Sequence, residues 1–114
     1  MQYLLLIYEN EKRFSNLDQA AFGKELGEYR AFGQQFSQKI KGGNALKPTA
    51  EAKSVRVRNG QRVTTDGPFA ETKEQLGGFY LVEAKDIDEA ITMAEKIPGA
   101  RYGCIEVRPI MTFS

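Results

Sequence analysis

The stretch QYLLLIY, residues 2–8, decides the fold class of this chain of 114 residues. Successive side chains of a β-strand point to opposite faces of its sheet. Tyr3, Leu5 and Ile7 would therefore lie on one face, and the alternating residues of the same run would present a second apolar face. A strand with two apolar faces belongs in a sheet that is covered on both sides. The rest of the chain must supply that cover.

Two helices are predicted. Apolar and aromatic residues recur at offsets of three or four over residues 17–41, which is the period of one helical face. The residues of this stripe are Phe22, Leu26, Tyr29, Phe32, Phe36 and Ile40. Residues 42–44, Gly-Gly-Asn, are expected to end the helix. A second helix is expected after Asp86, since Glu89 follows it at the capping-box spacing, and residues 98–99, Pro-Gly, are expected to stop it.

Further strands are predicted from alternating patterns and turn residues. They cover residues 53–58, 62–65, 79–84 and 103–110. Polar residues 10–16 are expected to form a turn and residues 45–52 an irregular connection.

The first two of these strands are predicted to form a hairpin around Asn59 and Gly60. A two-residue loop would set Val57 opposite Arg62 and mix apolar with charged side chains. A three-residue loop would set Val57 opposite Val63 and separate an apolar side from a polar one, so we expect this register. The polar side would then carry Arg56, Arg58, Thr64 and Asp66.

This order of elements predicts one α+β domain over residues 1–114. It corresponds to a ferredoxin-like fold of the βαββαβ type with an extra hairpin strand, in which two helices cover one face of an antiparallel sheet. The other face of the strand at residues 2–8 stays apolar and uncovered. A second copy packed sheet to sheet is the simplest cover, so we expect a homodimer.

Composition excludes several kinds of site. The chain has no histidine and one cysteine, Cys104, which rules out Ser-His-Asp and Cys-His nucleophile systems and imidazole ligands for zinc. We therefore expect no metal and no cofactor. A net charge of +1 does not indicate a basic surface that binds nucleic acid. The longest apolar run is too short for a membrane span. We expect a cytoplasmic protein in which Cys104 is a buried structural thiol.

The segment TDGPFAETKEQLGG, residues 65–78, is the strongest candidate for a site. Asp66 would be suited to acid–base chemistry if a partly apolar crevice raised its pKa. Lys73 could stabilise an anion. An alternative interpretation is local: Asp66, Gly67 and Pro68 are typical turn residues, and Phe69 would fill the core.

Arginines form a second candidate group. Arg56, Arg58 and Arg108 alternate along strands and could bind an anionic molecule bidentately, or could simply keep exposed strands from aggregating. Tyr29 lies on the helical stripe, where a core position is the common outcome, and a role as proton donor is the alternative.

The chain resembles the DGPF branch of the YCII-related family. The resemblance rests on residues 65–69, 71–74 and 76–78, on the opening YLLLIY, on Leu46 and Pro48, on VRVR at residues 55–58 and on IEVRPIM at residues 105–111. It implies a ferredoxin-like domain assembled as a dimeric α+β barrel. It also implies a cleft in which the YCII branch carries a His–Asp pair, and some relatives act on chlorinated aromatic compounds. The aspartate corresponds to Asp66, and Tyr29 is the candidate for the place of the absent histidine.

Two functions follow from these features. The first is binding of, or catalysis on, a small aromatic or anionic molecule in a cleft near the motif. Asp66 and Tyr29 would be the catalytic residues, and the ligand-binding residues would be Arg56, Arg58, Gly67, Pro68, Phe69 and Lys73. The second is a non-catalytic regulatory or ligand-binding homodimer, in a sigma-factor or stress context, in which the motif is structural.

Overall fold

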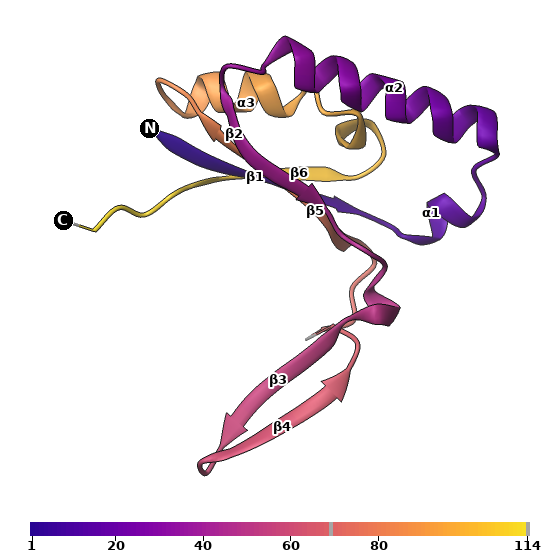
Figure 1. Cartoon of the computed structure of the whole chain (residues 1–114), viewed down its shortest axis with the longest axis vertical. Coiled ribbons are helices and arrows are strands. Elements are labelled where there is room, and N and C mark those ends of the chain that lie inside the picture. Colours follow the sequence, from indigo (N-terminus) through magenta and orange to yellow (C-terminus); the bar gives the residue numbers. More distant parts are fainter. Residues whose placement is uncertain (69, 114) are drawn as a thin grey trace.

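A computed structural model describes residues 1–68 and 70–113 of the chain. The elements follow in the order β1 (Gln2–Glu9), α1 (Lys12–Ser15), α2 (Gln19–Gln35), β2 (Ile40–Ala45), the 3-10 turn η1 (Thr49–Glu51), β3 (Lys53–Arg58), β4 (Gln61–Asp66), β5 (Gln75–Glu83), α3 (Ile87–Ala94), the 3-10 turn η2 (Pro98–Arg101) and β6 (Cys104–Pro109) (Figure 1).

The predicted α+β class and ferredoxin-like topology are confirmed. Within the described residues, the main sheet has the order β2-β5-β1-β6, and the strand pairs are antiparallel. Helices α2 and α3 lie on one side of this sheet (Figure 1). The predicted capping of α3 is also confirmed, because the Asp86 carboxylate accepts a hydrogen bond from the Glu89 N–H at 2.9 Å. β1 is one of the two interior strands of this sheet, with β5 and β6 as its neighbours, which suits its two apolar faces.

The core lies between the sheet and the helices. Leu5 at 0% exposure, Val82 at 0% and Met93 at 1% form its centre, and Phe32 of α2 packs with them. Burying a side chain of this size contributes roughly 1.5–3 kcal/mol. The opposite face of the sheet, here called the open face, carries Leu4, Leu6 and Tyr8 of β1, with Leu81 and Phe79 of β5 directly across from the two leucines.

Several predicted boundaries are wrong. The strand expected over residues 79–84 already begins at Gln75. The helix expected over residues 17–41 ends at Gln35, and Ile40–Ala45 forms strand β2 against β5. Gly42 and Gly43 do not end a helix as expected; they lie inside this strand beside an irregularity in its register. A Cβ at position 43 would approach the Phe79 carbonyl oxygen to 2.6 Å, so glycine permits the close strand pairing. The expected turn at residues 10–16 contains the short helix α1.

The predicted hairpin exists, but its register is wrong. Val57 pairs with Arg62 and Arg56 with Val63, so the loop has two residues. Asn59 and Gly60 have φ of 53° and 74°, the left-handed conformation that a tight type I′ hairpin turn requires. This turn chemistry outweighs the separation of apolar from polar side chains.

The β3–β4 hairpin, residues 53–66, is called the arm below. It forms a separate two-stranded sheet and projects from the side of the main sheet opposite the helices (Figure 1). The radius of gyration is 16.2 Å, whereas a compact domain of about 100 residues has about 13 Å. The arm accounts for this extended shape.

Candidate functional site

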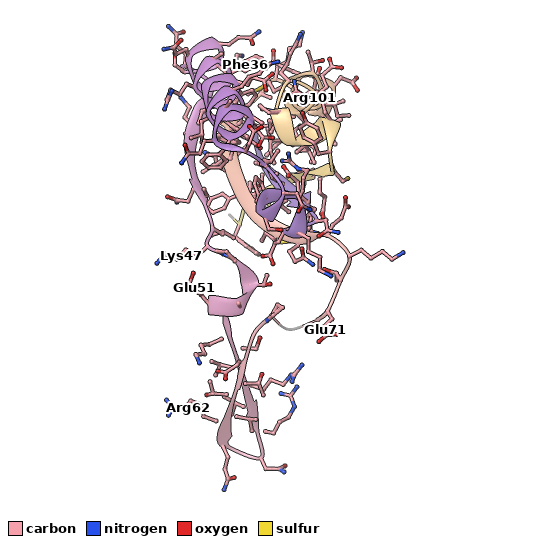
Figure 2. All side chains as sticks on the ribbon, turned by 90° about the vertical axis from the view of Figure 1, so that its right-hand side faces the viewer. Phe36, Lys47, Glu51, Arg62, Glu71 and Arg101 are labelled. Atoms are coloured by element: carbon pink, nitrogen blue, oxygen red, sulfur yellow. The ribbon has the colours of Figure 1, made fainter. Side chains whose placement is uncertain are left out.

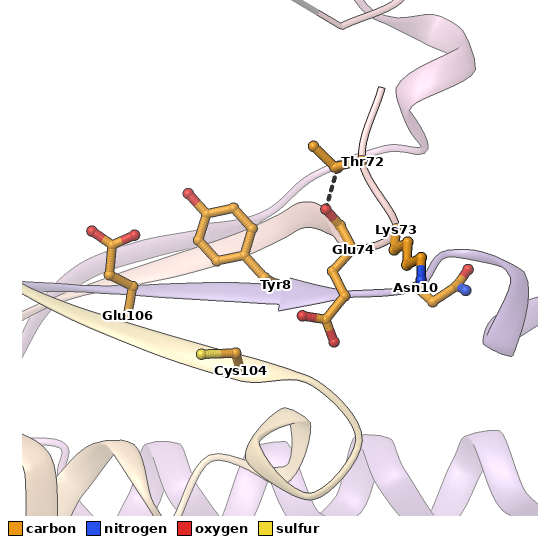
Figure 3. A pocket seen from close by; sticks show the side chains of 7 residues that line it. All are labelled: Tyr8, Asn10, Thr72, Lys73, Glu74, Cys104 and Glu106. Carbon is orange, nitrogen blue, oxygen red and sulfur yellow. Dashed lines mark hydrogen bonds between the residues drawn. The ribbon is translucent and has the colours of Figure 1, made fainter. Parts of the chain in front are cut away.

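A shallow hollow of about 780 Å³ lies on the open face, where β1 and β6 meet the segment that leads into β5 (Figure 3). Its lining comprises Tyr8, Asn10, Thr72, Lys73, Glu74, Cys104 and Glu106. Tyr8 and Cys104 are directly opposed on β1 and β6, so the strand register fixes a phenol beside a thiol. These groups can contact an aromatic ring and can hydrogen-bond to its oxygen substituents.

Residues 72–75 reach the hollow because Gln75 holds them there. Its side-chain amide donates to the Thr72 carbonyl at 2.6 Å and accepts from the Glu11 N–H at 2.9 Å. The Thr72 hydroxyl donates to the Glu74 carbonyl oxygen, which tightens the same turn (Figure 3). The second half of the segment at residues 65–78 is thereby hydrogen-bonded to Glu11, just after β1.

Charges in the hollow are balanced. Lys73 supplies an ammonium group, whereas Glu74 and Glu106 supply carboxylates. The Arg108 Nε donates to Glu106 at 2.6 Å and offsets one of them. The predicted buried thiol is wrong: Cys104 is exposed, and its side chain faces this hollow.

The first half of the motif closes the base of the arm. Gly67 has a φ of 87°, its N–H donates to the Ala52 carbonyl at 2.7 Å, and its own carbonyl accepts from the Ser54 hydroxyl at 2.8 Å. Pro68 follows this turn and is exposed. Phe69, expected in the core and at the ligand, lies outside the described residues. The turn interpretation of Gly67 is therefore confirmed.

The structure places the two candidate catalytic residues apart. The Asp66 side chain is 84% exposed and forms an ion pair with Lys53 across the base of the arm. Tyr29 is on α2, on the other side of the main sheet (Figure 1). Arg56 and Arg58 lie on β3, and the two-residue loop puts them on the face of the arm opposite Asp66, contrary to expectation. Lys73 is the predicted site residue that lines the hollow.

A buried charge cluster of Glu9, Arg13 and Glu25 lies beneath α2. Glu9 and Glu25 are only 5% and 7% exposed. The Arg13 guanidinium donates to Glu9 Oε2 at 2.6 Å and to Glu25 Oε1 at 2.9 Å. It also lies 4.1 Å from the centroid of the Tyr102 ring. Burial disfavours the charge on Arg13, but the hydrogen bonds to both carboxylates outweigh it and raise the pKa of the guanidinium.

Tyr29 borders this cluster. Burial raises the pKa of its hydroxyl above the ordinary value for tyrosine, and the charges of Glu9 and Glu25 raise it further. The hydroxyl also forms a hydrogen bond with the backbone of Gly99. A phenol in this setting stays protonated at neutral pH and gives up its proton less readily than an ordinary tyrosine, so its environment disfavours Tyr29 both as a proton donor and as a general base.

The sequence interpretation missed Glu9 and Glu25. One signal was available: Glu25 lies three residues after Phe22 and four before Tyr29, on the helical stripe itself. Phe22 and Leu26 are 44% and 41% exposed, so the buried line of α2 runs through the glutamate. An acid on an apolar stripe indicates a buried ion pair.

The family model of the YCII-related domain matches residues 1–114. An uncharacterised protein of Rhizobium meliloti (strain 1021) is 34% identical over 117 residues, which cover 99% of this chain and 94% of that protein. A solved structure with the same fold is 5-chloro-2-hydroxyhydroquinone dehydrochlorinase (TftG) from Burkholderia phenoliruptrix AC1100, in complex with 2,5-dihydroxybenzoquinone. The TM-score is 0.57 at 15% identity, over 97% of this chain and 94% of that one.

The chain thus belongs to the YCII-related domain family, as the sequence predicted. The DGPF branch is compatible with this assignment. Within residues 1–68 and 70–113, none of the helices combines the length and apolar character needed to cross a bilayer.

Proposed function

We propose that this protein forms a homodimer that binds a small aromatic molecule with acidic oxygen substituents in the hollow on the open face. One observation carries the proposal: Tyr8, Cys104 and Lys73, which bear a phenol, a thiol and an ammonium group, line the same hollow. The ring of Tyr8 supplies an apolar contact for another ring, and Lys73 supplies a partner for an ionised oxygen. The protein of similar fold from Burkholderia phenoliruptrix holds a small oxygenated quinone, which makes that quinone a suitable first probe.

The proposal of a homodimer rests on the apolar side chains of the open face. Leu4, Leu81 and Phe79 are half-buried within one chain, although they belong to a four-stranded sheet whose other face packs against the helices. Packing two such sheets at about 10 Å would remove these side chains from water. The same packing would turn the shallow hollow into an enclosed site.

A binding role without turnover is the second candidate, and the turn at Gly67 favours it. Asp66 and Gly67 close the base of the arm, so the motif has a structural purpose that requires no chemistry from Asp66. Turnover by Asp66 and Tyr29 remains the alternative proposal. It requires both residues to reach one ligand.

Titration with 2,5-dihydroxybenzoquinone tests the binding proposal by calorimetry and by thermal shift. We expect saturable binding to the wild type, and a loss of about tenfold or more in affinity for Lys73→Ala. Lys96→Ala is the matched control, because Lys96 is exposed at the end of α3. Equal binding by the wild type and Lys73→Ala would refute the site. Chromatography of the recovered quinone then separates binding from turnover: unchanged quinone supports the binding role.

A further inference from the structure

The arm exposes apolar side chains on both of its faces. Val55 and Val57 are 60% and 63% exposed on one face, and Val63 is 45% exposed on the other. An isolated two-stranded hairpin is marginal in water unless it packs against something else. An arm with exposed valines on both faces is therefore expected to pack against another protein surface.

The base of the arm is fixed to the body. The Glu11 carboxylate accepts hydrogen bonds from the N–H and the hydroxyl of Thr49, at 2.7 and 2.8 Å, just before β3. The bond from Gly67 to Ala52 closes the other side of the base. These contacts set the direction in which the arm leaves the sheet. Figure 2 shows Arg62 on the arm, at the opposite end of the molecule from Phe36 and Arg101.

In the proposed homodimer, the direction of the arm would bring it towards the second copy. The arm projects on the open-face side of the sheet (Figure 1). A sheet packed on that face would lie about 10 Å away, while a six-residue strand spans about 20 Å. The arm is thus long enough to pass along the edge of the second sheet. Two-fold symmetry would place both arms equivalently.

The arm carries positive charge that the hollow lacks. Residues 53–66 contain Lys53, Arg56, Arg58 and Arg62 against the single acid Asp66, a net charge of +3. The hollow contains Glu74 and Glu106 against Lys73. Within one chain, the hollow therefore offers little excess positive charge to an anionic ligand.

We propose that the arm of each copy lies against the hollow of the other copy, covers it with valine side chains and adds arginine side chains to it. This inference rests on the proposed homodimer and ligand, and it assigns the source of the positive charge that an acidic ligand needs. Both halves of the segment at residues 65–78 then serve the same assembly. Residues 65–67 set the direction of the arm on one copy, and residues 72–74 line the hollow that the arm of the other copy covers.

Disulfide trapping tests the arrangement in the full chain. Cysteine is introduced singly as Val57→Cys, Gln61→Cys or Val63→Cys, and the natural Cys104 in the hollow is the reporter. A disulfide requires the two Cα atoms to be within about 7 Å. We expect at least one variant to give a covalent dimer after mild oxidation with copper phenanthroline. Mass spectrometry should identify the arm peptide joined to the Cys104 peptide, and adding Cys104→Ser should abolish that dimer.

The control is Lys24→Cys, on the exposed surface of α2 on the helical side, which should give no Cys104-dependent dimer. The arm arrangement is overturned if the protein sediments as a dimer and binds the quinone, yet no arm position links to Cys104. A monomeric mass would instead overturn the homodimer itself, and a dimer without quinone binding would overturn the ligand.

A second variant separates the charge contribution from assembly. Arg58→Gln with Arg62→Gln leaves the valines in place, so we expect a dimeric mass and an affinity for 2,5-dihydroxybenzoquinone about tenfold weaker. Unchanged affinity in this variant would show that the arm contributes no charge to the site.

Discussion

The backbone of Gly99 lies directly against the carboxylate of Glu9. A Cβ at position 99 would come within 2.5 Å of Glu9 Oε1 and within 3.0 Å of the Tyr29 hydroxyl. The turn η2 can therefore cover the buried charge cluster only because residue 99 has no side chain.

Gly99→Ala should consequently lower the free energy of unfolding. A buried methyl group in a filled site costs about 1–3 kcal/mol, which urea denaturation would measure. The matched control is Gly33→Ala on α2, where a Cβ meets no atom within 4 Å. That change should raise stability by about 0.5–1 kcal/mol, because alanine is the better helix former. Equal effects of the two substitutions would contradict the close packing at Gly99.

Arg13→Leu should be among the more destabilising substitutions in the chain. It removes the partner of two buried carboxylates, Glu9 and Glu25. Breaking one side of a buried ion pair costs about 3–5 kcal/mol. Arg30→Leu on the exposed face of α2 is the control and should change stability by no more than about 0.5 kcal/mol.

Neutralising both acids should restore much of that loss. In the triple variant Glu9→Gln, Arg13→Leu, Glu25→Gln, no unpaired charge stays buried, and urea denaturation should place its stability above that of Arg13→Leu. A triple variant less stable than Arg13→Leu would show that the carboxylates have other essential partners.

Glu11→Gln should loosen the arm without unfolding the sheet. The substitution weakens the two hydrogen bonds that Glu11 accepts from Thr49. Hydrogen exchange followed by mass spectrometry should show faster exchange in residues 49–66, while the peptide that contains β1 stays protected. Glu51→Gln is the control at the same turn, since its contact with Lys47 is exposed. Slower exchange in the arm of Glu11→Gln would refute the anchoring role.

Glu89 should contribute to the loss of stability in acid. Its pKa is lowered from 4.5, first by the hydrogen bond from the Lys85 N–H and then by Lys39. A lowered pKa in the folded state means that the contribution is present above pH 4.5 and is lost as the pH falls below it. The melting temperature of Glu89→Gln should thus be lower than that of the wild type at pH 7, and the difference should shrink as the pH falls below 4.5. A difference that stays constant over this range would contradict the pKa shift.

The parts of the fold that the sequence predicts correctly rest on strong local signals. The run at residues 2–8 predicts a strand with two apolar faces, and Asp86 with Glu89 marks the start of α3. At Gly42 and Gly43, by contrast, the local signal predicts the wrong structure. Glycine ends helices in many proteins, and only the close approach of β5 shows that these residues belong to a strand.

The candidate site was predicted less well for a related reason. Lys73 lines the hollow as expected, but Tyr8, Cys104 and Glu106 come together only through the pairing of β1 with β6. The distance between Asp66 and the hollow depends on where the arm points. No periodicity within the chain encodes that direction, which follows from the contacts of Glu11 with Thr49.

The central place of β1 also has a consequence for how the chain folds. This strand is synthesised before either of its neighbours, which are formed by residues 75–83 and 104–109. Contacts between segments so far apart in sequence form slowly, because a large loop must close first. Until β6 has been made, the run QYLLLIY has an unpaired edge, and such an edge on an apolar strand invites aggregation. The strand in the interior of the native sheet is thus also an apolar segment that stays unpaired on one edge until nearly the whole chain has been made.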